Sequence, residues 1–106
     1  MQEVEWLHPW RPADESGERA GLEGQLNREV PSGHPLYGQS AILIARRVDS
    51  DDALFLLADN RVAEVHLTWR RGRETDPRWP ATATFPSLGE WADKSMKPQH
   101  REWQAE

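Results

Sequence analysis

The sequence predicts an α+β fold: a four-stranded, mainly antiparallel β-meander with one or two short helices packed on one face. Two observations predict it. Residues 40–69 hold three runs rich in apolar and β-branched residues, separated by short polar turns. Residues 15–30 instead repeat their apolar side chains with the period of a helix. With 106 residues the chain has material for one hydrophobic core, so a single domain over residues 1–106 is expected.

The N-terminal quarter of the chain divides into an arm and a helix. Residues 1–15 are expected to form an irregular arm, because their prolines and scattered acidic residues follow neither a helical nor an alternating period. Leu22, Leu26 and Val30 then recur at four-residue spacing. This single apolar stripe predicts a short amphipathic helix, which Pro31 ends.

The three strands of the meander are predicted at Ser40 to Val48, Ala53 to Ala58 and Arg61 to Trp69. Asp59-Asn60 separates the last two, and this pair tolerates the positive φ values of a two-residue hairpin turn. Counting outward from the turns predicts a core face with Leu43, Ala45, Leu54, Leu56, Ala63, Val65, Leu67 and Trp69. The other face mixes apolar and polar residues, so it is either partly covered by a helix or partly available for binding.

The last part of the chain predicts one more strand and one more helix. Residues 81–85 alternate like a short fourth strand at the edge of the sheet. Ser87 and Glu90 have the spacing of a capping box, and Pro98 is expected to end the helix that follows, leaving residues 98–106 as a frayed tail. Tryptophan buries a large apolar area, and Trp69 and Trp91 are the predicted core anchors.

The composition excludes several classes of function. The chain has no cysteine, which excludes disulfides and thiolate metal sites and predicts a cytoplasmic protein. It has no basic and apolar leader, and no segment near the ~18 apolar residues needed to cross a bilayer, so no membrane role is expected. A net charge of −5 opposes the attraction to phosphate on which nucleic-acid binding depends, so nucleic acid is not expected as a partner. No cofactor or metal is predicted, and the pattern leaves the oligomeric state open.

Three segments of the chain resemble segments of a known group of proteins. They are Gly33-His34-Pro35-Leu36-Tyr37-Gly38, the acidic turn that runs through Asp51-Asp52 into Ala53-Leu54-Phe55, and Val65-His66-Leu67-Thr68-Trp69. Together they resemble a family of small bacterial proteins of unknown function, over residues 22–91. The resemblance implies a shared fold, and no activity, cofactor or functional residue.

A polar cluster is predicted where the first and third strands end. These strands run parallel to each other on either side of the second, so their C-terminal ends lie at the same edge of the sheet. The cluster contains Arg46, Arg47, Asp49, Asp51, Asp52, His66, Arg70 and Arg71. The binding candidates among them are Arg46, Asp51, Asp52, His66 and Arg70. In one interpretation His66 is an acid, base or ligand and the arginines hold an anionic group. In the other, the charges neutralise one another in solvated ion pairs.

A second candidate for binding is the loop that contains His34 and Tyr37, because loops often carry function. Alternatively, Tyr37 covers the core and keeps only its hydroxyl at the surface. His34 precedes the first strand and His66 nears the end of the third, so the two are expected at opposite ends of the sheet, which argues against a shared metal.

These observations favour a non-catalytic protein-interaction domain with a regulatory or inhibitor-like role. No recognisable catalytic motif is present, and four tryptophans fall outside the predicted core, where they are typical interface anchors. They are Trp6, Trp10, Trp79 and Trp103. The alternative is a small ligand-binding protein or enzyme with a polar site at the strand ends around His66.

Overall fold

A computed structural model describes residues 4–69 and 75–105. It is an α+β fold with an antiparallel sheet in the order β1-β2-β3-β4-β5, so the meander has five strands where the sequence predicted four. The strands are β1 (Trp10–Pro12), β2 (Ala41–Arg47), β3 (Asp52–Leu57), β4 (Val62–His66) and β5 (Ala81–Phe85). The helical elements are α1 (Ser16–Glu29), α2 (Leu88–Trp91), the π-helical turn η1 (Ala92–Met96) and α3 (Lys97–Ala105).

The additional strand, β1, lies in the segment expected to be irregular. Trp10 pairs with Arg47 of β2, and Pro12 pairs with Ala45. A three-residue strand is too short to show an alternating pattern, and Pro12 argued against one. An edge strand tolerates proline, and the nearly complete burial of the Trp10 side chain, 1% exposed, holds the segment on the sheet.

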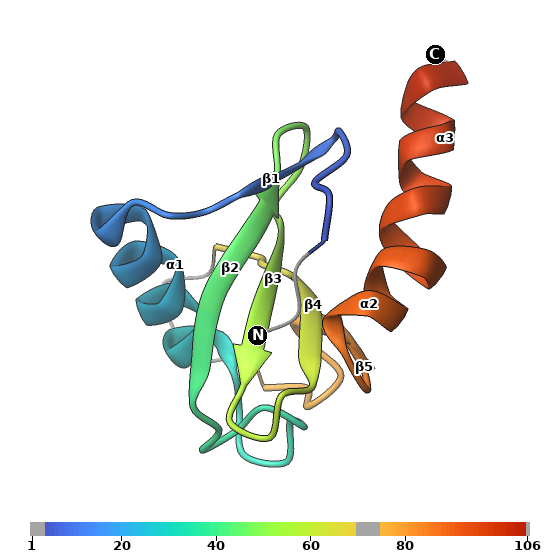
Figure 1. The fold of residues 1–106 in the computed structure, drawn as a ribbon. Helices are drawn as coiled ribbons and strands as arrows, with labels where there is room; N and C mark the ends of the chain where they lie inside the picture. Colours follow the sequence, from blue (N-terminus) through green and yellow to red (C-terminus); the bar gives the residue numbers. More distant parts are fainter. Residues whose placement is uncertain (1–3, 70–74, 106) are drawn as a thin grey trace.

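Helices cover both faces of the sheet, where the sequence predicted helices on one face (Figure 1). On the first face, α1 packs Leu22 and Leu26 against a cluster that includes Phe55. On the second, α2 and η1 pack Trp91 and Met96 against a cluster that includes Leu54, Trp10 and Val62. Adjacent residues of β3 therefore face different cores, which explains why this strand is apolar throughout rather than alternating.

The turn between β3 and β4 has three residues, and this changes the predicted register. The backbone N–H of Leu57 donates to the carbonyl of Arg61 at 2.9 Å, and Asn60 adopts a left-handed φ of 69°. Phe55 consequently lies opposite Ala63, one residue away from the predicted pairing. A slip of one residue exchanges the faces of a strand, so the prediction that Leu54 and Leu56 share a face with Ala63 is wrong.

The strand β2 also departs from the predicted pattern. Its register against β3 shifts between Leu43 and Ala45, which is a β-bulge around Ile44. Leu43 therefore belongs to the core cluster under α1, whereas Ala45 belongs to the cluster under α2 and η1. The sequence had placed both on one face.

The C-terminal segment is helical as far as Ala105, where the sequence predicted an end at Pro98 and a frayed tail. Ser87 caps α2 as predicted, its hydroxyl accepting the N–H of Glu90 at 3.2 Å. The wide π-helical turn η1 comes directly before α3, and Pro98 lies in the first turn of α3. The helix runs without a break from η1 into α3, so the proline is accommodated by the wide π-helical turn that precedes it rather than ending the helix. In the part of the chain that the structure describes, no helix has the length and apolar character to cross a membrane.

The tryptophans divide differently from the prediction. Trp91 is fully buried, as predicted, and lies edge-to-face against Trp10 with ring centroids 5.0 Å apart. Trp6 also packs against Trp91, with centroids 5.9 Å apart. Trp69, the other predicted anchor, is 46% exposed. Its place in the core is taken by Trp10, which the sequence had placed outside the core. Trp79 and Trp103 are exposed, as expected for residues outside the core.

Candidate functional site

The acidic turn and the end of β4 meet at one pair of side chains. Asp52 begins β3 and lies directly opposite His66, the last residue of β4. The Nδ1 atom of His66 lies 2.7 Å from Oδ1 of Asp52, a distance at which Nδ1–H donates to the carboxylate. His66 is exposed, so its second ring nitrogen, Nε2, remains accessible from solvent. The structure thus brings together two of the residues that the sequence singled out.

These two residues line a pocket of about 280 Å³ on the face of the sheet that carries α2 and η1. The strand registers arrange its walls in two rows across the sheet. One row runs from Asp52 through His66 to Ala81, and the next runs through Glu64 to Ala83. The pocket is lined by Asp52, Glu64, His66, Ala81, Thr82 and Ala83. The pocket is open because Ala81 and Ala83 of the edge strand β5 have small side chains, which leave space beside the carboxylates of Asp52 and Glu64.

Glu64 also lines this pocket, although the sequence did not single it out as a site residue. Its carboxylate accepts hydrogen bonds from Nε1–H of Trp91 at 2.7 Å and from the hydroxyl of Ser95 at 2.6 Å. The side-chain amide of Gln99 lies at 3.4 Å. Among the ion pairs of residues 4–69 and 75–105, none includes Glu64. A carboxylate in the middle of an otherwise apolar strand was the available signal.

Arg47 connects this pocket to the acidic turn. Its Nε and Nη2 atoms bind the two carboxylate oxygens of Asp49 at 2.8 Å each, and its Nη1 donates to Gln99 at 2.9 Å. The hydrogen bond from Arg47 holds the pKa of Asp49 below its ordinary value and raises the pKa of Arg47 in return. Arg47 also lies 3.9 Å from Asp52, so one guanidinium partly neutralises both aspartates.

Arg46 does not join the cluster, contrary to the prediction. It follows Ala45 across the bulge and its guanidinium lies 3.5 Å from Glu18 of α1, on the opposite face of the sheet. Glu18 also binds Arg11 at 2.6 Å, and this hydrogen bond lowers the pKa of Glu18. The backbone carbonyl of Asp51 accepts the N–H of Leu67 at 3.2 Å. Arg70 and Arg71 lie outside the described residues.

His34 has a structural role in the loop between α1 and β2. Its Nδ1 accepts the backbone N–H of Leu36 at 3.0 Å, so the ring proton is on Nε2, which donates to the carbonyl of Pro80 at 2.9 Å. Both nitrogens of this buried ring are occupied, and His34 is not available to a ligand. Tyr37, in the same loop, is half exposed.

The prediction that His34 and His66 lie at opposite ends of the sheet is wrong. Pro80, which His34 contacts, directly precedes Ala81, the partner of His66 in the sheet. The loop after α1 contacts the residue that precedes β5, and counting along the strands does not reveal this contact. Within residues 4–69 and 75–105, no three histidine, aspartate or glutamate side chains come close enough to hold a metal ion.

Comparisons with models of protein families, with curated proteins and with solved structures find no match to this chain. The resemblance to small bacterial proteins therefore stays a prediction, and the function has to be argued from the residues of the site.

Proposed function

We propose that the protein is a non-catalytic interaction domain that binds an extended, basic segment of another protein along the open edge of β5. The observation that carries this proposal is the pocket beside that edge, which presents Glu64, Asp52 and His66 behind a row of alanines. An acidic domain that covers a basic segment would act as a regulator or inhibitor of its partner.

The first support is the edge itself. Among residues 4–69 and 75–105, β5 is the last strand of the sheet, so one side of its backbone pairs with β4 and no described strand pairs with the other. Ala81–Phe85 contains no charge, proline or bulge, which are the features that normally protect an edge. The opposite edge, β1, is only three residues long and contains Arg11 and Pro12. The two edges thus differ in how readily they accept a strand.

The second support is the path that a partner side chain would follow. Strands lie about 4.8 Å apart, so a strand added to β5 would lie two strand widths from β4. A side chain opposite Ala83 would continue the row that contains Glu64, and one opposite Ala81 would continue the row of His66 and Asp52. Lysine and arginine have long apolar stems that can cross an alanine and carry their charge to these carboxylates.

The third support is electrostatic. Glu64 accepts hydrogen bonds but forms no ion pair within residues 4–69 and 75–105. Arg47 attracts it at longer range while binding Asp49 directly, so a lysine or arginine of the partner would supply the first direct counter-charge. The net charge of −5 attracts basic segments over a longer range and speeds their association at low salt.

The test uses two blocked pentapeptides, one that alternates threonine with lysine and one that alternates threonine with glutamate. The lysine peptide is expected to shift the backbone amide resonances of Ala81–Phe85, with an affinity that weakens as salt is added. Glu64→Gln should weaken binding at least about tenfold, since it removes the charge and keeps an acceptor oxygen. Equal binding of the two peptides would contradict the proposal.

Two arginine substitutions on β5 provide a matched pair. Ala83→Arg places a guanidinium in the row of Glu64, where it fills the pocket and should abolish peptide binding. Thr84→Arg adds the same side chain on the other face of the strand, opposite Ala63, and should change the affinity by about twofold or less. Both positions are exposed, so both variants are expected to fold.

A second candidate function, small-ligand binding or catalysis around His66, is favoured by the contact between His66 and Asp52. A carboxylate on Nδ1 orients an imidazole and leaves Nε2 to act on a ligand. A thermal-shift panel of small metabolites distinguishes this candidate. A compound that raises the Tm of the native protein and not of His66→Ala would favour it, and a panel without such a compound would leave the peptide proposal in place.

A further inference from the structure

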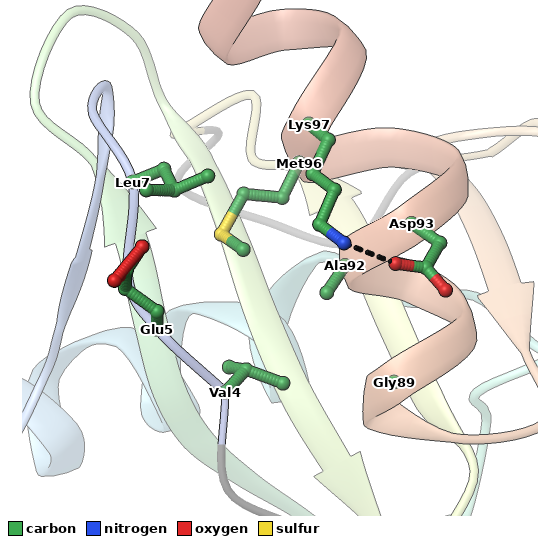
Figure 2. Close-up of a pocket in the computed structure, with 8 residues that line it drawn as sticks. All are labelled: Val4, Glu5, Leu7, Gly89, Ala92, Asp93, Met96 and Lys97. Atoms are coloured by element: carbon green, nitrogen blue, oxygen red, sulfur yellow. Dashed lines mark hydrogen bonds and ion pairs between the residues drawn. The ribbon is translucent and has the colours of Figure 1, made fainter.

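A second pocket lies between the N-terminal arm and the C-terminal helical segment (Figure 2). Its volume is about 310 Å³, at the lower end of the range found for small-molecule sites. The arm contributes one wall with Val4, Glu5 and Leu7. The other wall consists of Gly89, Ala92, Asp93, Met96 and Lys97, from α2, η1 and the start of α3.

The inner surface of this pocket is apolar. Figure 2 shows the side chains of Leu7 and Met96 extending toward each other from the two walls, with Val4 and Ala92 beside them. Met96 is 1% exposed and Ala92 5%, so their side chains belong to the core and are held in place by it. Gly89 leaves its part of the wall without a side chain. A flexible thioether adapts to flat or aromatic groups, so this surface suits a compact apolar body.

The charged residues at the pocket do not cancel. Nζ of Lys97 binds Oδ1 of Asp93 at 2.6 Å, which neutralises those two groups (Figure 2). Glu5, on the opposite wall, makes no hydrogen bond or ion pair with any residue in the described ranges 4–69 and 75–105. One negative charge therefore remains uncompensated beside an apolar surface, and the net charge of the chain, −5, has the same sign.

We propose that this pocket binds a small amphipathic amine, a compound with one apolar or aromatic body and one ammonium group. The body packs against Leu7, Ala92 and Met96, and the ammonium group lies beside the carboxylate of Glu5. A compound with a carboxylate or phosphate in place of the amine is disfavoured, because the uncompensated carboxylate of Glu5 repels it. The site is separate from the β5 edge and uses none of its residues.

The test compares three probes that share a phenyl ring and differ in charge: 2-phenylethylamine, 2-phenylethanol and 3-phenylpropanoate. Methyl-labelled methionine reports on the site, because the chain has two methionines and Met96 lines the pocket. The amine is expected to shift the Met96 methyl resonance saturably. The alcohol should bind about fivefold more weakly, which is the upper range for one exposed charge pair, and the carboxylate should not bind. Equal shifts with all three probes, or no saturation with the amine, would overturn the proposal.

Two charge substitutions make opposite predictions for the amine. Glu5→Gln should weaken 2-phenylethylamine about fivefold and leave 2-phenylethanol unchanged. Lys97→Gln should strengthen the amine, because it frees the carboxylate of Asp93. Glu102→Gln, an exposed change outside the pocket, is the control and should alter neither probe. An affinity for the amine that is the same in native protein and Glu5→Gln would show that charge does not select the ligand.

The two proposals can fail separately. Ala83→Arg should abolish binding of the lysine peptide and leave the response of Met96 to the amine intact. Glu5→Gln should weaken the amine about fivefold and leave binding of the lysine peptide unchanged. A variant that loses both responses would show that the two sites are coupled, which would contradict their independence.

Discussion

The buried carboxylate of Glu29, in the last turn of α1, accepts the backbone N–H of Trp69 at 2.8 Å. It also accepts the N–H and hydroxyl of Thr68, at 2.8 and 2.9 Å, and the side-chain amide of Gln25 at 2.6 Å. These contacts join the chain after β4 to the end of α1. They explain why Trp69 is not the core anchor that the sequence predicted: the chain turns at a φ of 61° there, and its indole is left nearly half exposed.

Glu29→Ala is expected to lower the free energy of unfolding by about 3 kcal/mol. The substitution leaves the N–H groups of Thr68 and Trp69 without their acceptor, and hydrogen bonds to charged groups contribute about 1.5–3 kcal/mol each. Urea denaturation measures the loss, and Glu29→Gln, which retains one acceptor oxygen, should fall between native and alanine.

The control for this prediction is Glu102→Ala, an exposed glutamate of α3. Its removal should change stability by no more than about 0.5 kcal/mol. If Glu29→Ala were as mild as Glu102→Ala, the contacts to Thr68 and Trp69 would not hold the chain after β4.

The turn between β3 and β4 makes a second prediction. Asn60 has a φ of 69°, which asparagine and glycine tolerate and β-branched residues do not. Asn60→Gly should leave stability unchanged within about 0.5 kcal/mol, whereas Asn60→Val should lower it by about 1–2 kcal/mol. Thermal unfolding of the two exposed variants gives the comparison. A valine variant as stable as the glycine variant would mean that the three-residue turn is absent in solution.

This turn also shows where the sequence stopped being informative about the fold. Asp59-Asn60 identified the hairpin correctly, because both residues are typical of turns. It did not distinguish two residues from three, and that single residue decides which side of β3 faces α1. Since β3 is apolar on both sides, its own pattern could not correct the error. The alternation that normally selects a register is absent when both faces are buried.

The sequence predicted only part of the candidate site, and the reason again lies in the strand register. Antiparallel pairing near the strand ends predicts that His66 lies beside the acidic turn, and the observed register places Asp52 directly opposite it. Of the two arginines predicted there, Arg47 binds Asp49 whereas Arg46 binds Glu18, because neighbours in a strand face opposite ways. Of the donors to Glu64, Trp91 and Ser95 lie in the helix that the sequence predicted, and Gln99 lies past Pro98, where the continuation of the helix had no local signal.

A third prediction concerns the indole N–H of Trp91, which donates to Glu64 at 2.7 Å. Trp91→Phe keeps an aromatic ring in the core and removes this donor. We expect a loss of about 2 kcal/mol, from the unpaired acceptor and the smaller ring. The measurement is urea denaturation, with Trp103→Phe on α3 as the control, which should lose less than about 0.5 kcal/mol because Trp103 lies at the surface. Equal losses in the two variants would argue that Glu64 needs no donor from the indole.

The final prediction concerns Asp76, which is half-buried, and Arg78, which is exposed; both precede β5. The guanidinium of Arg78 binds the carboxylate at 2.6 Å, and its backbone N–H donates at 2.9 Å. Two hydrogen bonds lower the pKa of Asp76 from 3.8 to about 2: the bond from the guanidinium of Arg78 contributes most, and the bond from its backbone N–H contributes next. Arg78→Gln should therefore raise the pKa of Asp76 toward 3.8 without reaching it.

The pH dependence has a definite sign. A carboxyl group whose pKa is lower in the folded state stabilises that state above its ordinary pKa, and the stabilisation is lost as the pH falls through the folded value. For Asp76 this window lies between pH 3.8 and about 2. Carboxyl-detected NMR titration measures the pKa directly, with Arg101→Gln on α3 as the control, which should leave it unchanged. If Asp76 still titrated near 2 in Arg78→Gln, the backbone N–H alone would account for its acidity, and the guanidinium contact would have no role in solution.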